Sequence, residues 1–250
     1  MQITAEAAYS SLIWSADVID DDAMLAIVDR APQLEYIKVD RLFVARNGYG
    51  IFKKLARRGR KAFFDAKIIE IPSKLAGLAQ TECRHQPWML NCMAGAVSGG
   101  PLAAEDPEKI EGLKRFANIC LNAGVRPCGV TVLTSKRAKL FAERGEFNGR
   151  SSQEQVLYYA EILLECGFTD MVCSPEEVQA VRAESRFDPL DLDTAGIRRR
   201  SSSLNDQART NTPAAALQAG ATRLVIGHDI TNGDDPAKNI DDIVGEMLAA

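Results

Sequence analysis

The chain has 250 residues, of which 46% are hydrophobic and 26% charged, and its formal net charge at pH 7 is −4. No apolar run approaches the roughly 18 to 20 residues that a membrane-spanning helix needs, so the composition predicts a globular protein without membrane contact. An acidic chain also lacks the basic footprint that nucleic acid binding requires. The N-terminus, MQITAEAAYSS, has no basic segment followed by an apolar one, so we expect a cytoplasmic protein.

Short segments rich in β-branched and aromatic residues recur along the chain. They predict eight β-strands, at 11–17, 36–40, 61–67, 88–94, 127–133, 170–174, 190–195 and 223–227. Amphipathic segments with helical spacing lie between them, the clearest at 21–31, 48–59, 107–124, 152–167 and 175–184. Eight strands alternating with helices predict an α/β fold, a single (β/α)8 TIM barrel that spans residues 1–250 as one domain.

Two segments interrupt this alternation. Residues 98–107 predict a loop after the fourth strand, and residues 196–213 predict a long polar connection after the seventh. A polar connection of this length in a compact barrel is typical of a lid or of a segment that grips a ligand, and a mobile surface loop is the alternative. Its arginines at 198, 199 and 200 suit an anionic group.

Cysteines and histidines are too scattered to suggest a metal site. The six cysteines include no Cys-x-x-Cys pair and most lie in apolar segments, which is typical of reduced thiols in a protein core. The two histidines, His85 and His228, cannot form a clustered histidine site, and they supply a Ser-His-Asp triad poorly. We therefore expect no bound metal.

Polar residues gather at the carboxyl ends of the predicted strands, where barrel enzymes place their catalytic groups. They are Asp17, Lys38, Asp65, Lys67, Asn91 and Ser135. Residues two apart on a strand point the same way, so Asp65 and Lys67 should share one side, with Lys38 of the neighbouring strand within reach. By spacing alone, these charges form either a structural ion-pair cluster or a catalytic device.

Nine short motifs, in order over nearly the whole chain, resemble those of the orotidine 5'-phosphate decarboxylase family. They are Asp17 in "AD", "IKV" at 37–39, D-x-K-x-x-E-I-P at 65–72, "SGG" at 98–100, "VTVLTS" at 130–135, "VCSPEE" at 172–177, "GIR" at 196–198, "DQ" to "TP" at 206–213 and "IGHDIT" at 226–231. The resemblance implies a dimeric barrel that decarboxylates a pyrimidine nucleotide without a cofactor.

The resemblance also implies four catalytic positions. Asp65 would lie against the substrate carboxylate and favour its loss, and Lys67 would stabilise the developing carbanion and protonate it. Lys38 would hold Asp65 and a ribose hydroxyl. Glu70 would enter the site of the partner subunit. Such catalysis is preorganised electrostatics, which needs no metal.

Further positions would bind the substrate. Asp17 would take a ribose hydroxyl, Ser135 would contact the pyrimidine, and Gln207 would bridge base and phosphate from the lid. The family's phosphate-binding arginine is His228 here, which offers one donor where an arginine offers two parallel ones. Arg198 or one of the two arginines that follow it would have to compensate.

Five other positions depart from the family pattern, among them Met93 in place of histidine and Arg199 in place of proline. The acid after D-x-K is aspartate in the family and Glu70 here, and the additional methylene moves the carboxylate by roughly 1.5 Å. Lys74 stands where the family has threonine, and Asp40 stands where it has glycine. These exchanges predict a reshaped substrate site, in which Lys74 could pair with Glu70 or Asp40.

Two other functions remain compatible with the sequence. Sugar-phosphate enzymes of the same superfamily use a similar D-x-K-x-x-D run with Mg²⁺, for which Asp40 or Glu70 could supply a further carboxylate. A barrel that binds a nucleotide-like ligand without turning it over is the other, motivated by Glu70 and His228. The "EIPS", "VTVLTS" and "DQ" motifs favour the decarboxylase.

Overall fold

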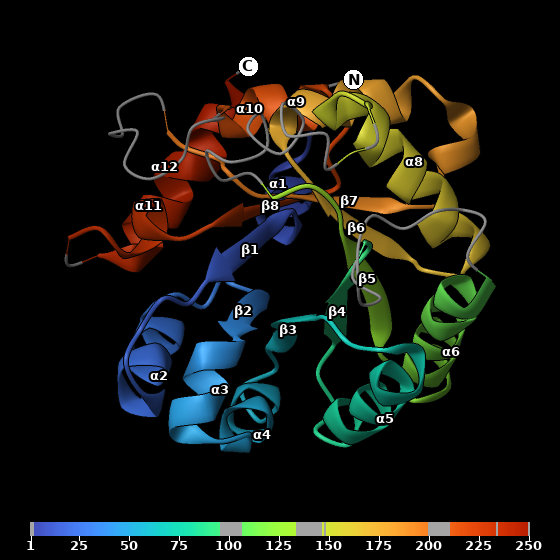
Figure 1. The fold of residues 1–250 in the computed structure, drawn as a ribbon. Coiled ribbons are helices and arrows are strands. Elements are labelled where there is room, and N and C mark those ends of the chain that lie inside the picture. The colour runs from blue at the N-terminus through green and yellow to red at the C-terminus, as the bar shows by residue number, and fades with distance from the viewer. Residues whose placement is uncertain are drawn as a thin grey trace.

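The computed structural model describes residues 3–95, 107–133, 147, 149–199, 211–233 and 235–249. Eight parallel strands close into a barrel in chain order, with β8 beside β1 (Figure 1). They are β1 (Leu12–Ser15), β2 (Tyr36–Asp40), β3 (Lys61–Ile68), β4 (Met89–Met93), β5 (Arg126–Val130), β6 (Asp170–Cys173), β7 (Asp191–Thr194) and β8 (Arg223–Ile226). The predicted (β/α)8 barrel is confirmed, and each predicted strand overlaps one of these eight.

Helices surround the strands (Figure 1). They are α1 (Ala5–Ser10), α2 (Asp21–Arg30), α3 (Arg41–Asn47), α4 (Gly50–Ala56), α5 (Pro72–Cys83), α6 (Pro107–Asn122), α8 (Ser152–Glu165), α9 (Pro175–Arg182), α10 (Pro213–Gln218), α11 (His228–Thr231) and α12 (Pro236–Leu248), with a 3-10 turn η1 at Ser185–Phe187. Ser151 and Ser174 begin α8 and α9 with capping boxes, which satisfy the free amides of the first turn. None of the described helices is long and apolar enough to cross a membrane.

The apolar core has two parts because alternate strand residues point to opposite faces. The larger part fills the space between strands and helices. The smaller part fills the barrel interior and comprises Ile13, Tyr36, Phe63, Met89, Cys128 and Val225. All six cysteines of the chain are buried and free, as the sequence predicts for core thiols. The interior cluster is small, and polar side chains lie at both ends of the barrel.

Strand β3 departs from regular geometry at its carboxyl end. Its register with β4 shifts between Phe64 and Ile68, which marks a β-bulge. Within this bulge Lys67 has φ +44°, in the left-handed region that side chains other than glycine rarely adopt. The sequence predicts a regular strand through residue 67, and the bulge is a departure from it that redirects the end of β3.

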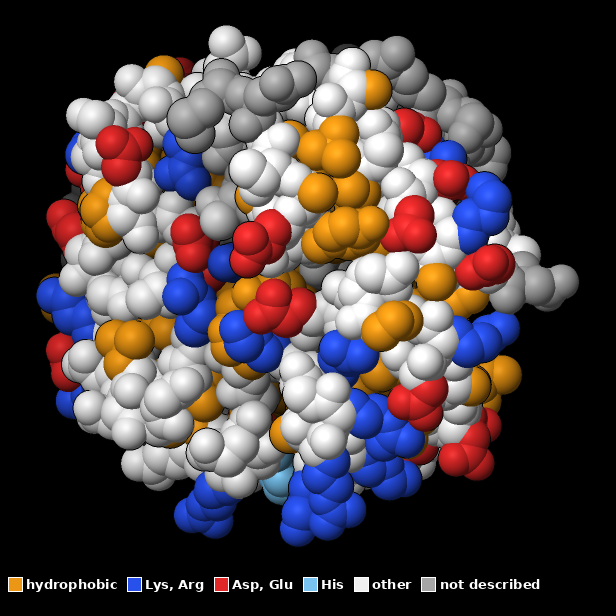
Figure 2. Space-filling view, turned by 180° about the vertical axis from the view of Figure 1, so that it is seen from behind, with side chains coloured by type: hydrophobic (Ala, Val, Ile, Leu, Met, Phe, Trp, Pro, Cys, Tyr) orange, Lys and Arg blue, Asp and Glu red, His pale blue; other side chains and the backbone are white. Residues whose placement is uncertain are grey.

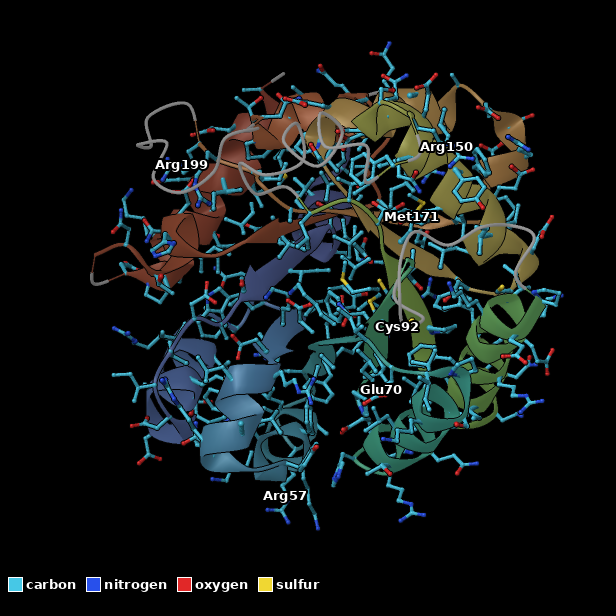
Figure 3. All side chains as sticks on the ribbon, viewed as in Figure 1. Arg57, Glu70, Cys92, Arg150, Met171 and Arg199 are labelled. Carbon is cyan, nitrogen blue, oxygen red and sulfur yellow. The ribbon has the colours of Figure 1, made fainter. Side chains whose placement is uncertain are left out.

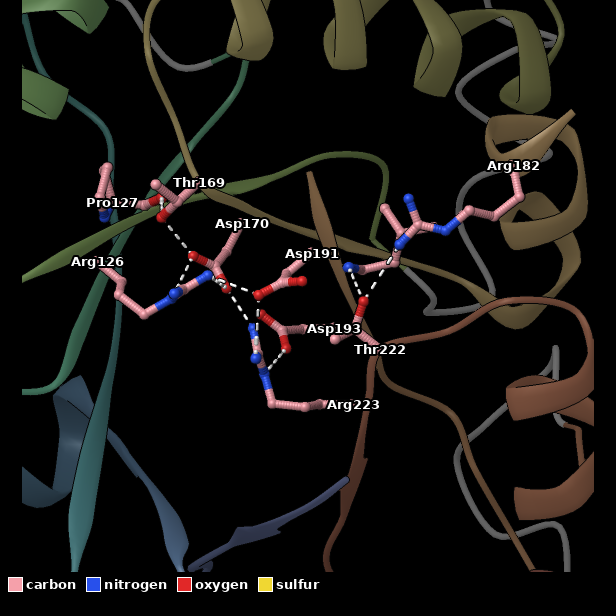
Figure 4. A network of polar contacts seen from close by, with 10 residues as sticks. Arg126, Pro127, Thr169, Asp170, Arg182, Asp191, Asp193, Thr222 and Arg223 are labelled. Carbon is pink, nitrogen blue, oxygen red and sulfur yellow. Dashed lines mark hydrogen bonds and ion pairs between the residues drawn. The ribbon is translucent and has the colours of Figure 1, made fainter. Parts of the chain in front are cut away.

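Charged side chains close the amino-terminal end of the barrel (Figure 4). Arg126 donates to Asp170 at 2.8 Å and to Asp191 at 2.6 Å. Arg223 donates to Asp193 at 2.7 Å and also bonds Asp170 and Asp191. Burial raises the pKa of Asp193 to about 7 although Arg223 acts to lower it. Three carboxylates therefore face two guanidinium groups, and the excess negative charge favours one bound proton.

A basic segment lies on the surface at 53–61, KKLARRGRK, where α4 ends and β3 begins. Three of its side chains form ion pairs: Lys54 with Asp21, Arg58 with Asp29 and Lys61 with Glu35. Figure 2 shows Lys and Arg side chains gathered along one margin of the face opposite to that of Figure 1, and Figure 3 shows Arg57 pointing outward there. Neighbouring acids thus offset part of this charge, and the absence of nucleic acid binding stays a prediction.

Candidate active site

A cavity of about 290 Å³ lies at the carboxyl ends of the strands. Its polar lining consists of Ser15, Asp17, Lys38, Asp65, Lys67, Arg198 and His228. Apolar side chains such as Val130, Val172 and Val225 line the rest. This is the end of a barrel at which catalytic groups are expected, and six residues predicted from the sequence meet there.

Asp65 is the centre of this cavity and only 7% of its side chain is exposed. Its Oδ2 accepts from Lys38 Nζ at 2.8 Å and from Lys67 Nζ at 2.5 Å. Its Oδ1 accepts from Asn91 Nδ2 at 2.7 Å. Burial acts to raise the pKa of Asp65, but the two ammonium groups outweigh burial and hold that pKa far below its usual range. The site therefore carries a fixed carboxylate between two cations.

The two lysines differ in exposure. The Lys38 side chain is 13% exposed, and although burial acts to lower its pKa, Asp65 raises the pKa above its usual value. The Lys67 side chain is 43% exposed and lies at the open side of the cavity. Lys38 is therefore a permanent counter-ion, whereas Lys67 can reach both Asp65 and a bound ligand.

Asn91 has no role in the sequence-based assignment beyond its place at a strand end. It is fully buried on β4 and contacts both Asp65 and the backbone of Lys67. The signal in the sequence was a single amide within the otherwise apolar segment 88–94. A buried polar side chain in a core strand is rarely retained without partners, which is the reason such a signal points to a site.

Asp17, Arg198 and His228 lie at another part of the cavity wall. Ser15 Oγ donates to Asp17 Oδ2 at 3.3 Å, which orients this carboxylate. Arg198 Nη1 donates to the Ile197 carbonyl at 3.1 Å, and its buried Nε has no hydrogen-bond partner among the residues that the structure describes. The cavity thus holds an acid suited to hydroxyl groups and two cationic or donor side chains suited to an anion.

Arg199 is not available to replace the family's phosphate-binding arginine. Its Nε donates to Glu246 on α12 at 3.0 Å, and its backbone amide donates to Asp229 at 2.8 Å. Arg200 lies outside the described residues. Of the two arginines in this run that the structure describes, Arg198 lines the cavity and Arg199 does not.

Three predicted site residues do not line the cavity of this chain. Asp40 Oδ1 accepts from the Phe43 amide at 2.6 Å, so this oxygen caps α3, and the assignment of Asp40 to substrate binding stays a prediction. Glu70 accepts from the Ile71 amide at 3.1 Å beside the start of α5 (Figure 3), and Lys74 is exposed on α5. Among the described ion pairs, Lys74 joins neither acid.

Other predicted features lie outside the described residues. They are Ser135, Gln207 and the larger part of the connection at 196–213. The two ends of that connection are joined, because Arg198 N donates to the Asn211 carbonyl at 3.0 Å and Ile197 forms a bridge with Asn211. The connection therefore starts and finishes at the rim of the cavity.

The arrangement suits carbanion chemistry better than a divalent cation. Both oxygens of Asp65 already accept from Lys38, Lys67 and Asn91, and Asp40, considered above as a magnesium ligand, caps a helix. Within the described parts of the chain, no three His, Cys, Asp or Glu side chains are grouped to hold a metal ion. The buried anion can instead repel a substrate carboxylate, and the half-exposed Lys67 ammonium beside it can protonate the carbon that the carboxylate leaves.

Known proteins resemble this chain over most of its length. A family model described as "Orotidine 5'-phosphate decarboxylase / HUMPS family" matches residues 10–243. The chain is 34% identical over 227 residues to the orotidine 5'-phosphate decarboxylase of Prochlorococcus marinus, covering 91% of each chain. It is 34% identical over 245 residues to that of Pseudomonas aeruginosa, covering 96% of this chain and 99% of the other. The crystal structure of the protein of that name from Lactobacillus acidophilus has a TM-score of 0.74 at 23% identity, covering 94% of this chain and 98% of the other, and supports the fold.

Proposed function

The chain belongs to the orotidine 5'-phosphate decarboxylase family, and from this premise we propose that it is a carboxy-lyase that removes carbon dioxide from orotidine 5'-phosphate or a related pyrimidine nucleoside acid. The observation that carries the proposal is Asp65, buried between the ammonium groups of Lys38 and Lys67 in the cavity. This triad is what decarboxylation through a carbanion requires of a protein that acts without a cofactor.

The proposed reaction begins with the substrate carboxylate held against Asp65. Repulsion between the two anions is relieved when the carbon–carbon bond breaks and carbon dioxide leaves. The electron pair stays on the ring carbon, where the Lys67 ammonium stabilises it and then transfers a proton to it. Lys38 keeps Asp65 ionised throughout. The interactions with Asp65 and Lys67 are strongest when the charge moves to the carbon, so they act on the transition state.

The remaining cavity residues divide between the parts of a nucleotide. Apolar side chains such as Val130, Val172 and Val225 suit the faces of a pyrimidine ring. We assign the ribose hydroxyl groups to Asp17 and Lys38. We assign the phosphate to Arg198 and His228. By family resemblance, Ser135 contacts the pyrimidine and Gln207 bridges base and phosphate. The exchange of arginine for His228 should weaken phosphate binding relative to the family pattern.

We further propose that the active form is a homodimer in the cytoplasm. Exposed apolar side chains follow three neighbouring strands at the active-site end: Ile19, Leu42, Ile69 and Ile71. Glu70 lies between two of them and does not line its own cavity, so a second copy packed on this surface would receive its carboxylate. Six buried free thiols suit a reducing compartment such as the cytoplasm.

We expect sedimentation velocity to give a dimer. A monomer under assay conditions would contradict the proposed homodimer.

The test of the activity is the ultraviolet absorbance of orotidine 5'-phosphate, followed at saturating substrate with and without EDTA. We expect turnover that EDTA leaves unchanged. Turnover that requires added Mg²⁺ would contradict the cofactor-free mechanism. If orotidine 5'-phosphate is not converted, other pyrimidine and nucleoside carboxylates are tested in the same way. Binding without carbon dioxide release across this panel would favour the non-catalytic barrel.

A further inference from the structure

Asn91 connects the two catalytic residues of β3 from the neighbouring strand β4. Its Nδ2 donates to Asp65 Oδ1 at 2.7 Å, and its Oδ1 accepts from the Lys67 backbone amide at 2.7 Å. The side chain is fully buried. One amide therefore holds the carboxylate of one catalytic residue and the main chain of the other.

The contact of Asn91 with the Lys67 amide lies at the β-bulge of β3. Lys67 has φ +44° in the bulge where β3 loses its register with β4. Such a backbone conformation costs on the order of 1 to 3 kcal/mol for a residue other than glycine, and it persists only where surrounding contacts maintain it. The bulge also takes the Lys67 amide out of the ladder with β4, and Asn91 Oδ1 accepts it instead.

The contact with Asp65 determines how its carboxylate is turned. Both ammonium groups bond Oδ2, whereas Asn91 is the donor that the described residues provide to Oδ1. Without that donor the carboxylate could rotate so that one lysine bonds each oxygen. Such a rotation would change the position of the Lys67 ammonium relative to the substrate carbon, and shifts of about 1 Å in a reacting array can cost on the order of 10²-fold in rate.

We propose that Asn91 is a positioning residue for the decarboxylation, which fixes the rotation of the Asp65 carboxylate and the bulged backbone that aims Lys67. The inference rests on the proposed function, because it concerns the same cavity. Asn91 itself need not touch the substrate, and it does not line the cavity. Its loss should therefore lower kcat and leave KM within a few-fold of the wild-type value.

Two substitutions separate the two contacts. Asn91→Ala removes both contacts, and we expect a loss in kcat of about 10²-fold at every pH.

Asn91→Asp keeps an acceptor for the Lys67 amide but can donate to Asp65 only when the introduced carboxyl is protonated. That carboxyl would face Asp65, Lys67, Lys38 and, across the ladder, Cys128 of β5. We therefore expect Asn91→Asp to approach wild-type kcat in mild acid and to lose activity as the pH rises, relative to wild type.

The matched control is Cys92→Ala on the same strand. Cys92 is as buried as Asn91 but points to the helix layer instead of the barrel interior. It should lower stability without changing the pH profile of kcat. A kcat loss in Asn91→Ala no larger than that of Cys92→Ala would overturn the proposal, and so would a pH profile of Asn91→Asp that parallels the wild type.

Hydrogen exchange at the Lys67 amide tests the positioning contact without turnover. We expect exchange to become at least about 10-fold faster in Asn91→Ala, and to stay slow in Asn91→Asp and Cys92→Ala, because an accepted amide exchanges only after local opening. If the wild type fails to decarboxylate any substrate while this pattern holds, the proposed function fails and the structural part of the inference stands. Unchanged exchange in Asn91→Ala would overturn the inference itself.

Discussion

Substituting Lys67 by alanine is expected to reduce kcat by about 10⁴-fold or more and to leave the barrel folded. The substitution removes the ammonium group that stabilises the carbanion and the proton that the carbanion receives. Removal of one electrostatic donor costs on the order of 10² to 10³-fold, and removal of a general acid adds on the order of 10² to 10⁴-fold. The Lys67 side chain is 43% exposed, so its loss leaves no cavity in the core.

The matched control for this prediction is Lys61→Ala. Lys61 begins the same strand at its other end and pairs with Glu35 at the surface, 2.6 Å away. It should retain wild-type kcat and KM in the same absorbance assay. The far-ultraviolet circular dichroism of both variants should match the wild type. Full activity of Lys67→Ala in a folded protein would contradict the mechanism proposed above.

Arg223→Met is expected to lower the free energy of unfolding by about 3 to 5 kcal/mol. Arg223 bonds Asp170, Asp191 and Asp193, and the side chains of Asp170 and Asp193 are fully buried. Methionine has a similar length but no charge, so it would leave buried carboxylates without a principal counter-ion. The network would then have to bind a further proton or draw in water, and both weaken the native state.

Urea denaturation measures the free energy of unfolding of Arg223→Met. Two further variants test whether its loss comes from the buried charges. Arg58→Ala removes a surface arginine paired with Asp29, and its denaturation midpoint should stay close to the wild-type value because exposed pairs contribute little. Arg223→Met combined with Asp193→Asn should recover part of the loss, since one buried charge disappears with its partner. A midpoint for Arg223→Met equal to that of the wild type would mean that the network is dispensable for stability.

The barrel was predictable from the sequence because its signals are local. A run of apolar and β-branched residues indicates each strand, and apolar residues at helical spacing indicate each long helix. The order of strand and helix then restricts the fold, since parallel neighbours need a crossover between them. The ends of the elements were predicted less accurately than their existence. For example, the segment 48–59 is predicted as a helix, and only Gly50–Ala56 is helical.

The acid and base of the site were also predictable, because Asp65 and Lys67 are close in sequence and Lys38 lies on the adjacent strand. The contacts that Asp40 and Arg199 make were not predictable. Asp40 is the last residue of a predicted strand, and only the position of α3 shows that its carboxylate caps a helix. Arg199 is engaged by Glu246, which is 47 residues away.

The sequence by itself determined the barrel, the end at which the site lies, and the two charges of opposite sign on β3. Tertiary structure alone decided that β3 bulges at Lys67, that Asn91 bridges the bulge to Asp65, and which cations remain free to meet a substrate. The physical reason is the range of the interactions. Strand and helix patterns repeat within a few residues, whereas the partner of a buried polar group comes from whichever strand the closed barrel brings beside it.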